Sequence, residues 1–256
     1  MRNRGSCFEL LRMRPHDHIG WVFTGSCEFA AVAKPFLEEG AQRGERLMYV
    51  ADDPGSTPMA ELAAALDSDT LQIARISEVY GESGVVDADT QRATFADALA
   101  EALTKGYTGI RVAADNTPLV TDPERLQAWI RWEIVADRLM SENPVTGLCA
   151  FDRQQINIDT LRHLATLHPL APSDAPAPQF LLFSDEGQLR LEGEVDAFAV
   201  SQAALALKHL PPKTELTVDL TATVVVTKAV MVALHRLIEK GLSISVRDAS
   251  GEYALA

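Results

Sequence analysis

Short apolar runs alternate with longer amphipathic stretches through the first 170 residues. Residues 47–50 (LMYV) form an apolar run of strand length, and such runs are typical of parallel strands covered on both faces by helices. A later stretch has apolar residues at helical spacing, namely Leu126, Trp129, Ile130, Ile134 and Leu139. The pattern predicts strands at 18–24, 46–51, 71–76, 107–114 and 145–151, and helices at 28–43, 58–66, 89–105, from 122 onward and at 159–167. We therefore expect an α/β unit built on a parallel sheet.

Local signals mark where these helices begin, bend and end. Gly106 stops the helix predicted at 89–105, because glycine readily adopts the left-handed conformation that ends helices. Asp122 and Pro123 predict a helix start, with the aspartate as N-cap and the proline in the first turn. Pro35 lies inside a predicted helix, so we expect a kink or a late start there.

The composition changes after residue 170. Residues 171–178 are rich in proline, alanine and small polar residues, which predicts a linker between a first domain at 1–170 and a second at 179–256. Beyond the linker, two short strands flank Ser184-Asp185-Glu186-Gly187, which is a hairpin signal. Helices at 200–209 and 227–240 then alternate with strands at 216–220 and 243–247. The second domain is therefore a small α/β unit.

The charge balance limits the classes of partner. The chain holds 23 Lys and Arg against 36 Asp and Glu, a net charge of −13, which disfavours nucleic acid and anionic lipid as partners. No apolar run reaches membrane-spanning length. The three cysteines, Cys7, Cys27 and Cys149, have no metal-ligand spacing and predict a reduced, cytoplasmic protein whose thiols pack as small apolar groups.

Acidic residues follow three of the predicted strands of the first domain. Asp52, Asp115 and Asp152 each lie at a strand end, and the carboxyl ends of parallel strands share one edge of the sheet. We expect these carboxylates, with Arg153, to form a ligand-binding rim. The alternative is that each aspartate only ends its strand and caps the next turn or helix.

Candidate chemistry elsewhere in the sequence is sparse. Neither glycine-rich nucleotide-binding motif is present, and residues 24–27 (TGSC) offer one glycine and no lysine, so we expect no ATP hydrolysis. His16 and His18 could share one side of a strand, but no third ligand accompanies them, so we expect no metal. His168 closes a helix, where interaction with the helix dipole accounts for it. We expect no catalytic set and no cofactor.

A series of short segments in the first domain together carries a family resemblance. They are His18-Ile19, residues 35–40 (PFLEEG), residues 44–46 (GER) with Tyr49-Val50, residues 110–115, Glu133, residues 149–153 (CAFDR) and His168-Pro169. With these segments the first domain resembles the MEDS family, a sensory domain of methanogens and methylotrophs. The resemblance implies a RecA/KaiC-like parallel-sheet domain that lacks the phosphate loop. It also implies that the domain senses a small molecule, since halogenated and one-carbon compounds are among the ligands of the family. It adds His18 and Glu133 to the expected ligand-binding residues. The alternative for His18, which begins the first strand, is a place at the far end of that strand from the rim.

Three segments of the second domain carry another family resemblance, namely residues 189–196 (LRLEGEVD), 218–220 (VDL) and 234–246. With these segments the domain resembles STAS domains, the fold of anti-sigma factor antagonists. In that family a serine at a helix start is phosphorylated to control partner binding, but Lys228 and Ala229 stand at the serine positions here. Thr227 is then either an N-cap or an altered phosphorylation site. The sequence also stops before the last helix that STAS domains usually have.

Three functional hypotheses follow. The first is a cytoplasmic signalling regulator that senses a small molecule and binds a protein partner such as an anti-sigma factor or a switch kinase. The second is an enzyme that uses Asp52, Asp115 and Glu133 around a metal or nucleotide. The third is an inert interaction module. We favour the regulator, expect no enzymatic activity, and leave the oligomeric state open, with a homo-oligomer among the alternatives.

Overall fold

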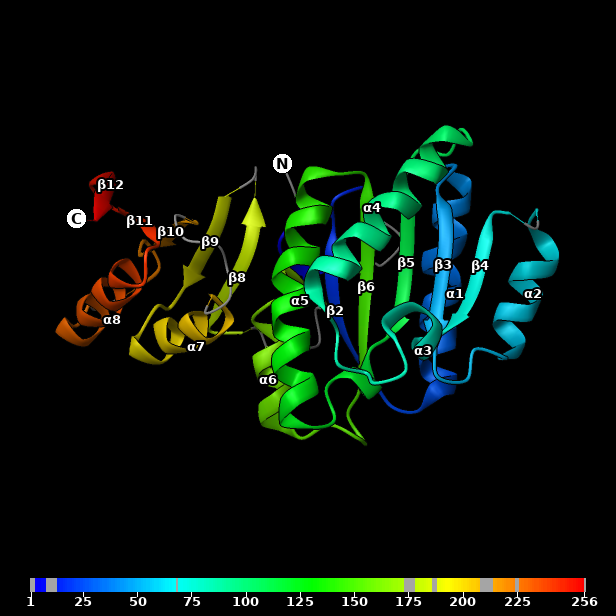
Figure 1. Ribbon diagram of the computed structural model, residues 1–256, viewed down its shortest axis with the longest axis horizontal. Coiled ribbons are helices and arrows are strands. Elements are labelled where there is room, and N and C mark those ends of the chain that lie inside the picture. Colours follow the sequence, from blue (N-terminus) through cyan, green and yellow to red (C-terminus); the bar gives the residue numbers. More distant parts are fainter. Residues whose placement is uncertain are drawn as a thin grey trace.

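The computed structural model contains two β-sheets that share one long helix (Figure 1). It describes residues 3–7, 13–67, 69–172, 178–185, 188–207, 214–223 and 226–255. The proposed linker residues 173–177, the hairpin residues 186 and 187 and the end of the helix predicted at 200–209 lie outside these ranges. No helix in the described ranges has both the length and the apolar content needed to cross a membrane.

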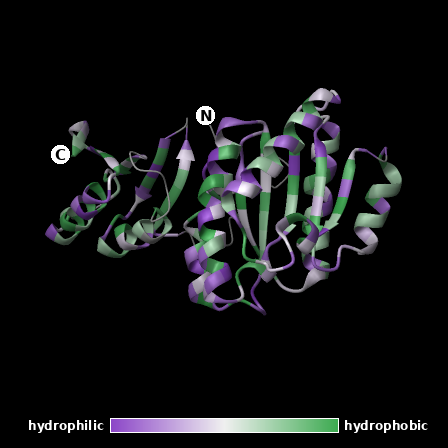
Figure 2. Ribbon diagram, viewed as in Figure 1, coloured by the Kyte–Doolittle hydropathy of each residue, from purple (hydrophilic) through white to green (hydrophobic). Residues whose placement is uncertain are grey.

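The larger sheet has seven strands in the order β1-β7-β2-β6-β5-β3-β4, and every neighbouring pair is parallel. Its strands are β1 (Gly5–Cys7), β2 (His18–Phe23), β3 (Arg46–Ala51), β4 (Leu71–Arg75), β5 (Ile110–Asp115), β6 (Val145–Asp152) and β7 (Leu170–Pro172). Figure 2 colours its central strands hydrophobic along most of their length, as expected for strands buried on both faces.

Helices cover both faces of this sheet, as the strand pattern predicts. They are α1 (Ser26–Gln42), α2 (Thr57–Ala65), α3 (Ile76–Tyr80), α4 (Ala88–Thr104), α5 (Pro123–Glu142) and α6 (Ile158–Ala165). The first two pack on one face, where Phe29 and Met59 join its core, and the other four pack on the opposite face with Phe95 and Trp132. Successive strand residues point to opposite faces, so each central strand contributes to both cores.

Most predicted elements are present, with differences at short or irregular segments. Asp122 caps α5 by accepting hydrogen bonds from the N–H groups of Glu124 and Arg125, which confirms the predicted helix start. Helix α1 begins at Ser26 and runs through Pro35, so the late start, one of the two alternatives expected at this proline, does not occur. Strand β7 includes the first two residues of the predicted linker and pairs with β1, another strand too short to give a periodic signal.

The smaller sheet has five strands in the order β12-β11-β10-β9-β8. Its elements are β8 (Phe180–Asp185), β9 (Gln188–Gly193), α7 (Ala197–Leu207), β10 (Glu215–Asp219), α8 (Lys228–Glu239), β11 (Ser243–Asp248) and β12 (Gly251–Leu255). Strands β8 and β9 pair antiparallel, which confirms the predicted hairpin pairing. Strand β12 was not predicted and pairs antiparallel with β11 at the edge of the sheet.

Helix α5 belongs to the hydrophobic cores of both sheets. Trp129 and Trp132 pack into the core of the large sheet, whereas Ile130 and Ile134 pack with Phe180 in the core of the small one. Both sets recur at three- or four-residue spacing, which places them on two different faces of one helix. In Figure 1, α5 accordingly lies between β2 and β8. The two sheets are thus joined by packed side chains.

Candidate functional site

The structure places Asp52, Asp115 and Asp152 together at the carboxyl edge of the large sheet. They end or follow the neighbouring strands β3, β5 and β6. Burial raises the pKa of Asp115, and the nearby charges of Asp152 and Asp52 raise it further. This grouping agrees with the rim that the strand ends predict.

The rim carboxylates are largely engaged with their own turns. Asp115 Oδ1 accepts from the Thr117 N–H at 3.1 Å, and Asp152 Oδ1 accepts from the Gln154 N–H at 2.9 Å. Burial acts to raise the pKa of Asp152, but the hydrogen bonds that this carboxylate accepts, including the one from Gln154, outweigh burial and lower the pKa. Arg153 is exposed and donates to the Val22 carbonyl. Such contacts are typical of aspartates that end strands, which was the alternative left open by the sequence.

A second group of polar side chains is buried on the other side of the sheet. It consists of His18 at the start of β2, Glu133 on α5, Cys149 on β6 and His168 after α6, and we call it the buried cluster. The two histidines and Glu133 are at most 1% exposed, and Cys149 is 9% exposed. Their ligand atoms all lie within 4.8 Å of one another.

The side chains of the buried cluster converge through their terminal atoms. His18 Nε2 lies 3.3 Å from Cys149 Sγ and 3.4 Å from Glu133 Oε2. His168 Nε2 lies 3.5 Å from Glu133 Oε1, and the two imidazole rings are 4.4 Å apart. Among the described residues, the two carboxylate oxygens of Glu133 and the Nε2 atom of His168 have no hydrogen-bond partner.

Each histidine is oriented by a contact of its Nδ1 atom, the ring nitrogen that does not face the cluster. His168 Nδ1 donates to the Leu164 carbonyl at 2.8 Å, and His18 Nδ1 lies 2.9 Å from Asp137 Oδ1. A carbonyl can only accept, so His168 in its neutral form presents an unprotonated Nε2 to the cluster. The carboxylate of Asp137 favours the same tautomer in His18.

The electrostatics of the cluster differ from one group to the next. Burial and the neighbouring His168 lower the pKa of His18. Burial also acts to lower the pKa of His168, but the Glu133 carboxylate outweighs it and the pKa is raised. Burial, with Glu133 beside it, raises the pKa of the Cys149 thiol well above its ordinary value. His168 therefore takes up a proton more readily than His18.

Two glycines make room for these side chains. A Cβ atom on Gly20 of β2 would lie 2.7 Å from His168 Cγ, closer than real Cβ contacts. A Cβ atom on Gly147 of β6 would lie 2.7 Å from the Cε atom of Met140 and 3.4 Å from His18 Cδ2. Only strands without side chains at these two positions allow α5 and His168 to approach the sheet so closely.

Asp137 connects the buried cluster to the small sheet. Its Oδ1 atom contacts His18, and its Oδ2 atom accepts a hydrogen bond from the backbone N–H of Ser184 in β8 at 2.5 Å. Asp137 is 1% exposed and Ser184 is 2% exposed. A buried polar contact therefore runs from the interior of the large sheet to the backbone of the small one.

A small apolar cavity adjoins the cluster at Cys149. Its volume is about 20 Å³, close to the space of one water molecule. Its lining includes Tyr80, Phe95, Trp132 and Met140. The cavity is therefore lined mostly by apolar side chains and meets the polar groups of the buried cluster at Cys149.

The structure separates His18 and Glu133 from the acidic rim. Cys149 precedes Asp152 by three residues on β6, so it lies about 10 Å back along the strand and faces the opposite side of the sheet. His18 lies further back, paired with Gly147. The structure therefore does not bring His18 and Glu133 together with the rim. His18 lies at the far end of its strand, which was the alternative left open for it, and both residues lie on the α5 side of the sheet.

Cys149 and His168 were missed as site residues because each has an ordinary explanation in sequence. The available signal was a pair of acids, Glu133 and Asp137, four residues apart on a helix rich in apolar residues. His16 does not join the cluster. Its Nδ1 atom donates to the Met140 carbonyl.

The switch residues of the second domain lie at the start of α8. Thr227 is the N-cap, and its hydroxyl accepts from the Val230 N–H at 3.4 Å, in agreement with the capping role predicted for it. Thr227 and Lys228 are both exposed. They lie in the second domain, at the end of the chain away from the MEDS-like part of the sequence, and are not part of the buried cluster.

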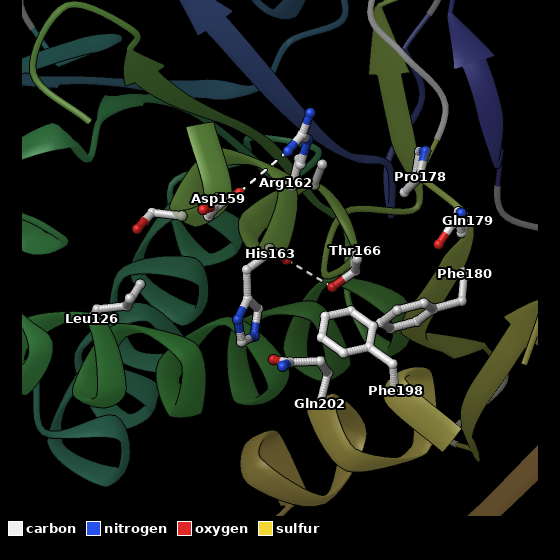
Figure 3. Close-up of a pocket in the computed structure, with 12 residues that line it drawn as sticks. Leu126, Asp159, Arg162, His163, Thr166, Pro178, Gln179, Phe180, Phe198 and Gln202 are labelled. Atoms are coloured by element: carbon white, nitrogen blue, oxygen red, sulfur yellow. Dashed lines mark hydrogen bonds and ion pairs between the residues drawn. The ribbon is translucent and has the colours of Figure 1, made fainter. Parts of the chain in front are cut away.

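An open groove of about 870 Å³ lies where α6 meets β8 and α7 (Figure 3). Its walls include His163, Phe180, Phe198 and Gln202, and the Phe198 side chain is 60% exposed. Burial lowers the pKa of His163. The groove is lined by residues from both halves of the chain.

Comparison with known proteins gave limited matches. No curated protein matches this chain. Among solved structures, EssC (ATPases 2 and 3) from Geobacillus thermodenitrificans is similar at 16% identity and a TM-score of 0.32. The match covers 78% of this chain and 46% of the EssC chain, so this chain spans less than half of it. Similarity at this level leaves the RecA/KaiC-type relation a prediction.

The family comparison is more specific. The family model of the methanogen/methylotroph, DcmR sensory domain, MEDS, matches residues 17–169, more than half of the chain. All four residues of the buried cluster, as well as Asp137 and the rim aspartates, lie inside the matched region. The family is described as a sensory domain, which indicates a signalling or sensing role. The chain therefore belongs to the MEDS family.

Proposed function

We propose that the protein is a cytoplasmic signalling regulator whose MEDS domain senses a small molecule and whose second domain binds a protein partner. The buried cluster and its adjoining cavity are the sensing site in this proposal. The observation that carries it is the Asp137 side chain, which contacts His18 on one side and the Ser184 backbone on the other.

Helix α5 is the physical link in this proposal. Glu133 and Asp137 extend from it into the buried cluster, whereas Ile130 and Ile134 pack into the core of the small sheet. Packed helices have discrete arrangements, so a ligand that shifts helix α5 through Glu133 or Asp137 also changes the packing on its other face. The signal thus passes through side chains that are already in contact.

The second domain is proposed to be a STAS domain without its usual phosphoserine. Support comes from the order of its elements, a hairpin followed by two strands that alternate with α7 and α8, and from the sequence motifs. Lys228 and Ala229 replace the serines, and Lys228 adds a fixed positive charge that cannot imitate phosphate. Partner binding is then controlled by the first domain, and an anti-sigma factor or switch kinase is the class of partner expected.

The proposed role is regulatory and not catalytic. The enzyme hypothesis requires Glu133 beside Asp52 and Asp115, but Glu133 lies with the two histidines. The rim aspartates Asp115 and Asp152 accept hydrogen bonds from turn amides, which accounts for their position without a reaction. We include the absence of nucleic-acid binding in the proposal because of the acidic charge of the chain.

Quantitative cross-linking from the native cell tests this proposal. Asp137→Asn keeps the side-chain size but leaves one oxygen to accept from two donors, so either the His18 or the Ser184 contact is lost. Glu142→Gln on the same helix is the matched control, since it changes only an exposed pair with Arg138. We expect a partner bound by the wild type and the control in equal amounts and by Asp137→Asn in a different amount. Equal capture by all three proteins would contradict the proposal.

A further inference from the structure

The buried cluster has the donor set of a transition-metal site. Two imidazole nitrogens, one thiol sulfur and one carboxylate converge in it from four separate elements. Imidazole, thiolate and carboxylate are the three ligand types that Zn²⁺ and related divalent ions take from proteins. All four side chains are buried, so no solvent-exposed acidic surface is involved.

The distances within the cluster agree with tetrahedral coordination. Ligand atoms bound at about 2.0–2.3 Å from an ion, at tetrahedral angles, lie about 3.3–3.6 Å from one another. The separations involving His18 Nε2 are 3.3 Å to the Cys149 sulfur and 3.4 Å to Glu133, and His168 Nε2 lies 3.5 Å from Glu133. These three separations are typical of donors around one ion, and the ligand atoms of all four residues lie within 4.8 Å of one another.

The outer contacts orient both imidazoles as metal-binding histidines are oriented. Histidines that bind metals usually donate their second N–H to a carboxylate or a backbone carbonyl. His18 has Asp137 in that position, and His168 has the Leu164 carbonyl. Both rings therefore direct an Nε2 lone pair toward Glu133, at the centre of the group.

Glu133 provides an independent indication of a cation. Its side chain is 1% exposed, and in the described residues neither of its oxygens accepts a hydrogen bond. A buried carboxylate without such partners is costly, and a bound cation is one of the few ways to offset that cost. If His168 is neutral, its Nε2 atom also has no hydrogen-bond partner among the described residues, whereas His18 Nε2 has the Cys149 thiol.

We propose that His18, Glu133, Cys149 and His168 bind one divalent transition-metal ion of the Zn²⁺ type. Asp137 does not bind the ion but orients His18 through its Nδ1 atom. The sequence predicted no metal, because the four ligands lie far apart along the chain and only the fold brings them together. The inference deepens the proposed function, since the ion would sit at the proposed sensing site and contact Ser184 through Asp137.

The test uses full-length protein in which Cys7 and Cys27 are replaced by serine. Cys149 is then the only thiol in the chain, so any thiolate signal comes from the cluster. The protein is produced with Co²⁺ or Zn²⁺ in the medium, and its metal content and absorption spectrum are measured. We expect one ion per chain, and for Co²⁺ the visible bands of tetrahedral coordination with a thiolate-to-metal band in the near ultraviolet.

Two further variants examine the ligands and the outer contact. Removing the thiol by Cys149→Ala should abolish the thiolate-to-metal band. Asp137→Asn should weaken Zn²⁺ binding about 10- to 100-fold in competition with a chromophoric chelator. Glu142→Gln is the control for the latter and should bind Zn²⁺ as the parent does, because its side chain is exposed on the same helix.

The outcomes separate this inference from the proposed function. A folded parent that contains no metal, or a Co²⁺ protein without the thiolate band, overturns the metal site even if Cys149→Ala does not fold. Equal Zn²⁺ affinity in Asp137→Asn and Glu142→Gln overturns the role of Asp137 in orienting His18. Partner capture that responds to Asp137→Asn in a metal-free protein would leave the signalling proposal standing alone.

Discussion

The close approach of His168 to β2 gives a quantitative prediction for Gly20→Ala. The added Cβ would lie 2.7 Å from His168 Cγ and 2.9 Å from its Nδ1, so the ring or the strand has to move. Overpacking of this kind costs about 1–3 kcal/mol. Replacing glycine also restricts the unfolded chain, which returns about 0.4–1 kcal/mol. We expect a net loss of about 1–2 kcal/mol, or a decrease in Tm of about 2–8 °C.

Thermal unfolding followed by circular dichroism measures this loss. Gly55→Ala is the matched control, because its Cβ would meet only Asp53 Oδ1 at 3.5 Å, and it should change stability by less than about 0.5 kcal/mol. In a His168→Ala background the clash is absent, so Gly20→Ala should then have little effect or stabilise the protein. An equal loss in both backgrounds would refute the reasoning, since the cost would not come from the ring.

Two further predictions concern other buried charges. Arg111→Met should lower the free energy of unfolding by about 3–5 kcal/mol in urea titrations, because it leaves the buried Glu45 carboxylate without its partner. The exposed control Arg138→Met should cost less than about 1 kcal/mol, and equal costs would contradict the prediction. Burial raises the pKa of Asp115 in the folded chain, so stability falls as the pH rises from the ordinary pKa of aspartate to the raised one, and the loss is complete above it. Asp115→Asn should therefore stabilise the protein at neutral pH but not below about pH 3, and a constant difference would count against this cause.

The sequence by itself determined the central strands of the large sheet and the helices between them. Apolar runs near 47–50 and 145–151 and the amphipathic helices between the strands are local patterns, and each element follows from a few neighbouring residues. The cap at Asp122 and the hairpin before β9 are local in the same sense. Strand alternation also placed the rim aspartates at one edge, because parallel strands all end on the same side.

Only the tertiary structure decided which side chains meet in the interior. Periodicity shows that α5 has apolar faces, but it does not show that one face packs on the large sheet and another on the small one. The short strands β1, β7 and β12 gave no signal either, because their pairing depends on distant partners.

The buried cluster illustrates this limit most clearly. His18 and His168 are 150 positions apart, and the strand register and the small size of Gly20 bring them to within 4.4 Å, ring to ring. A sequence read locally gives each of these residues a separate and ordinary explanation. Their shared environment, and with it the proposed chemistry, arises because long-range packing excludes water from four polar groups at once.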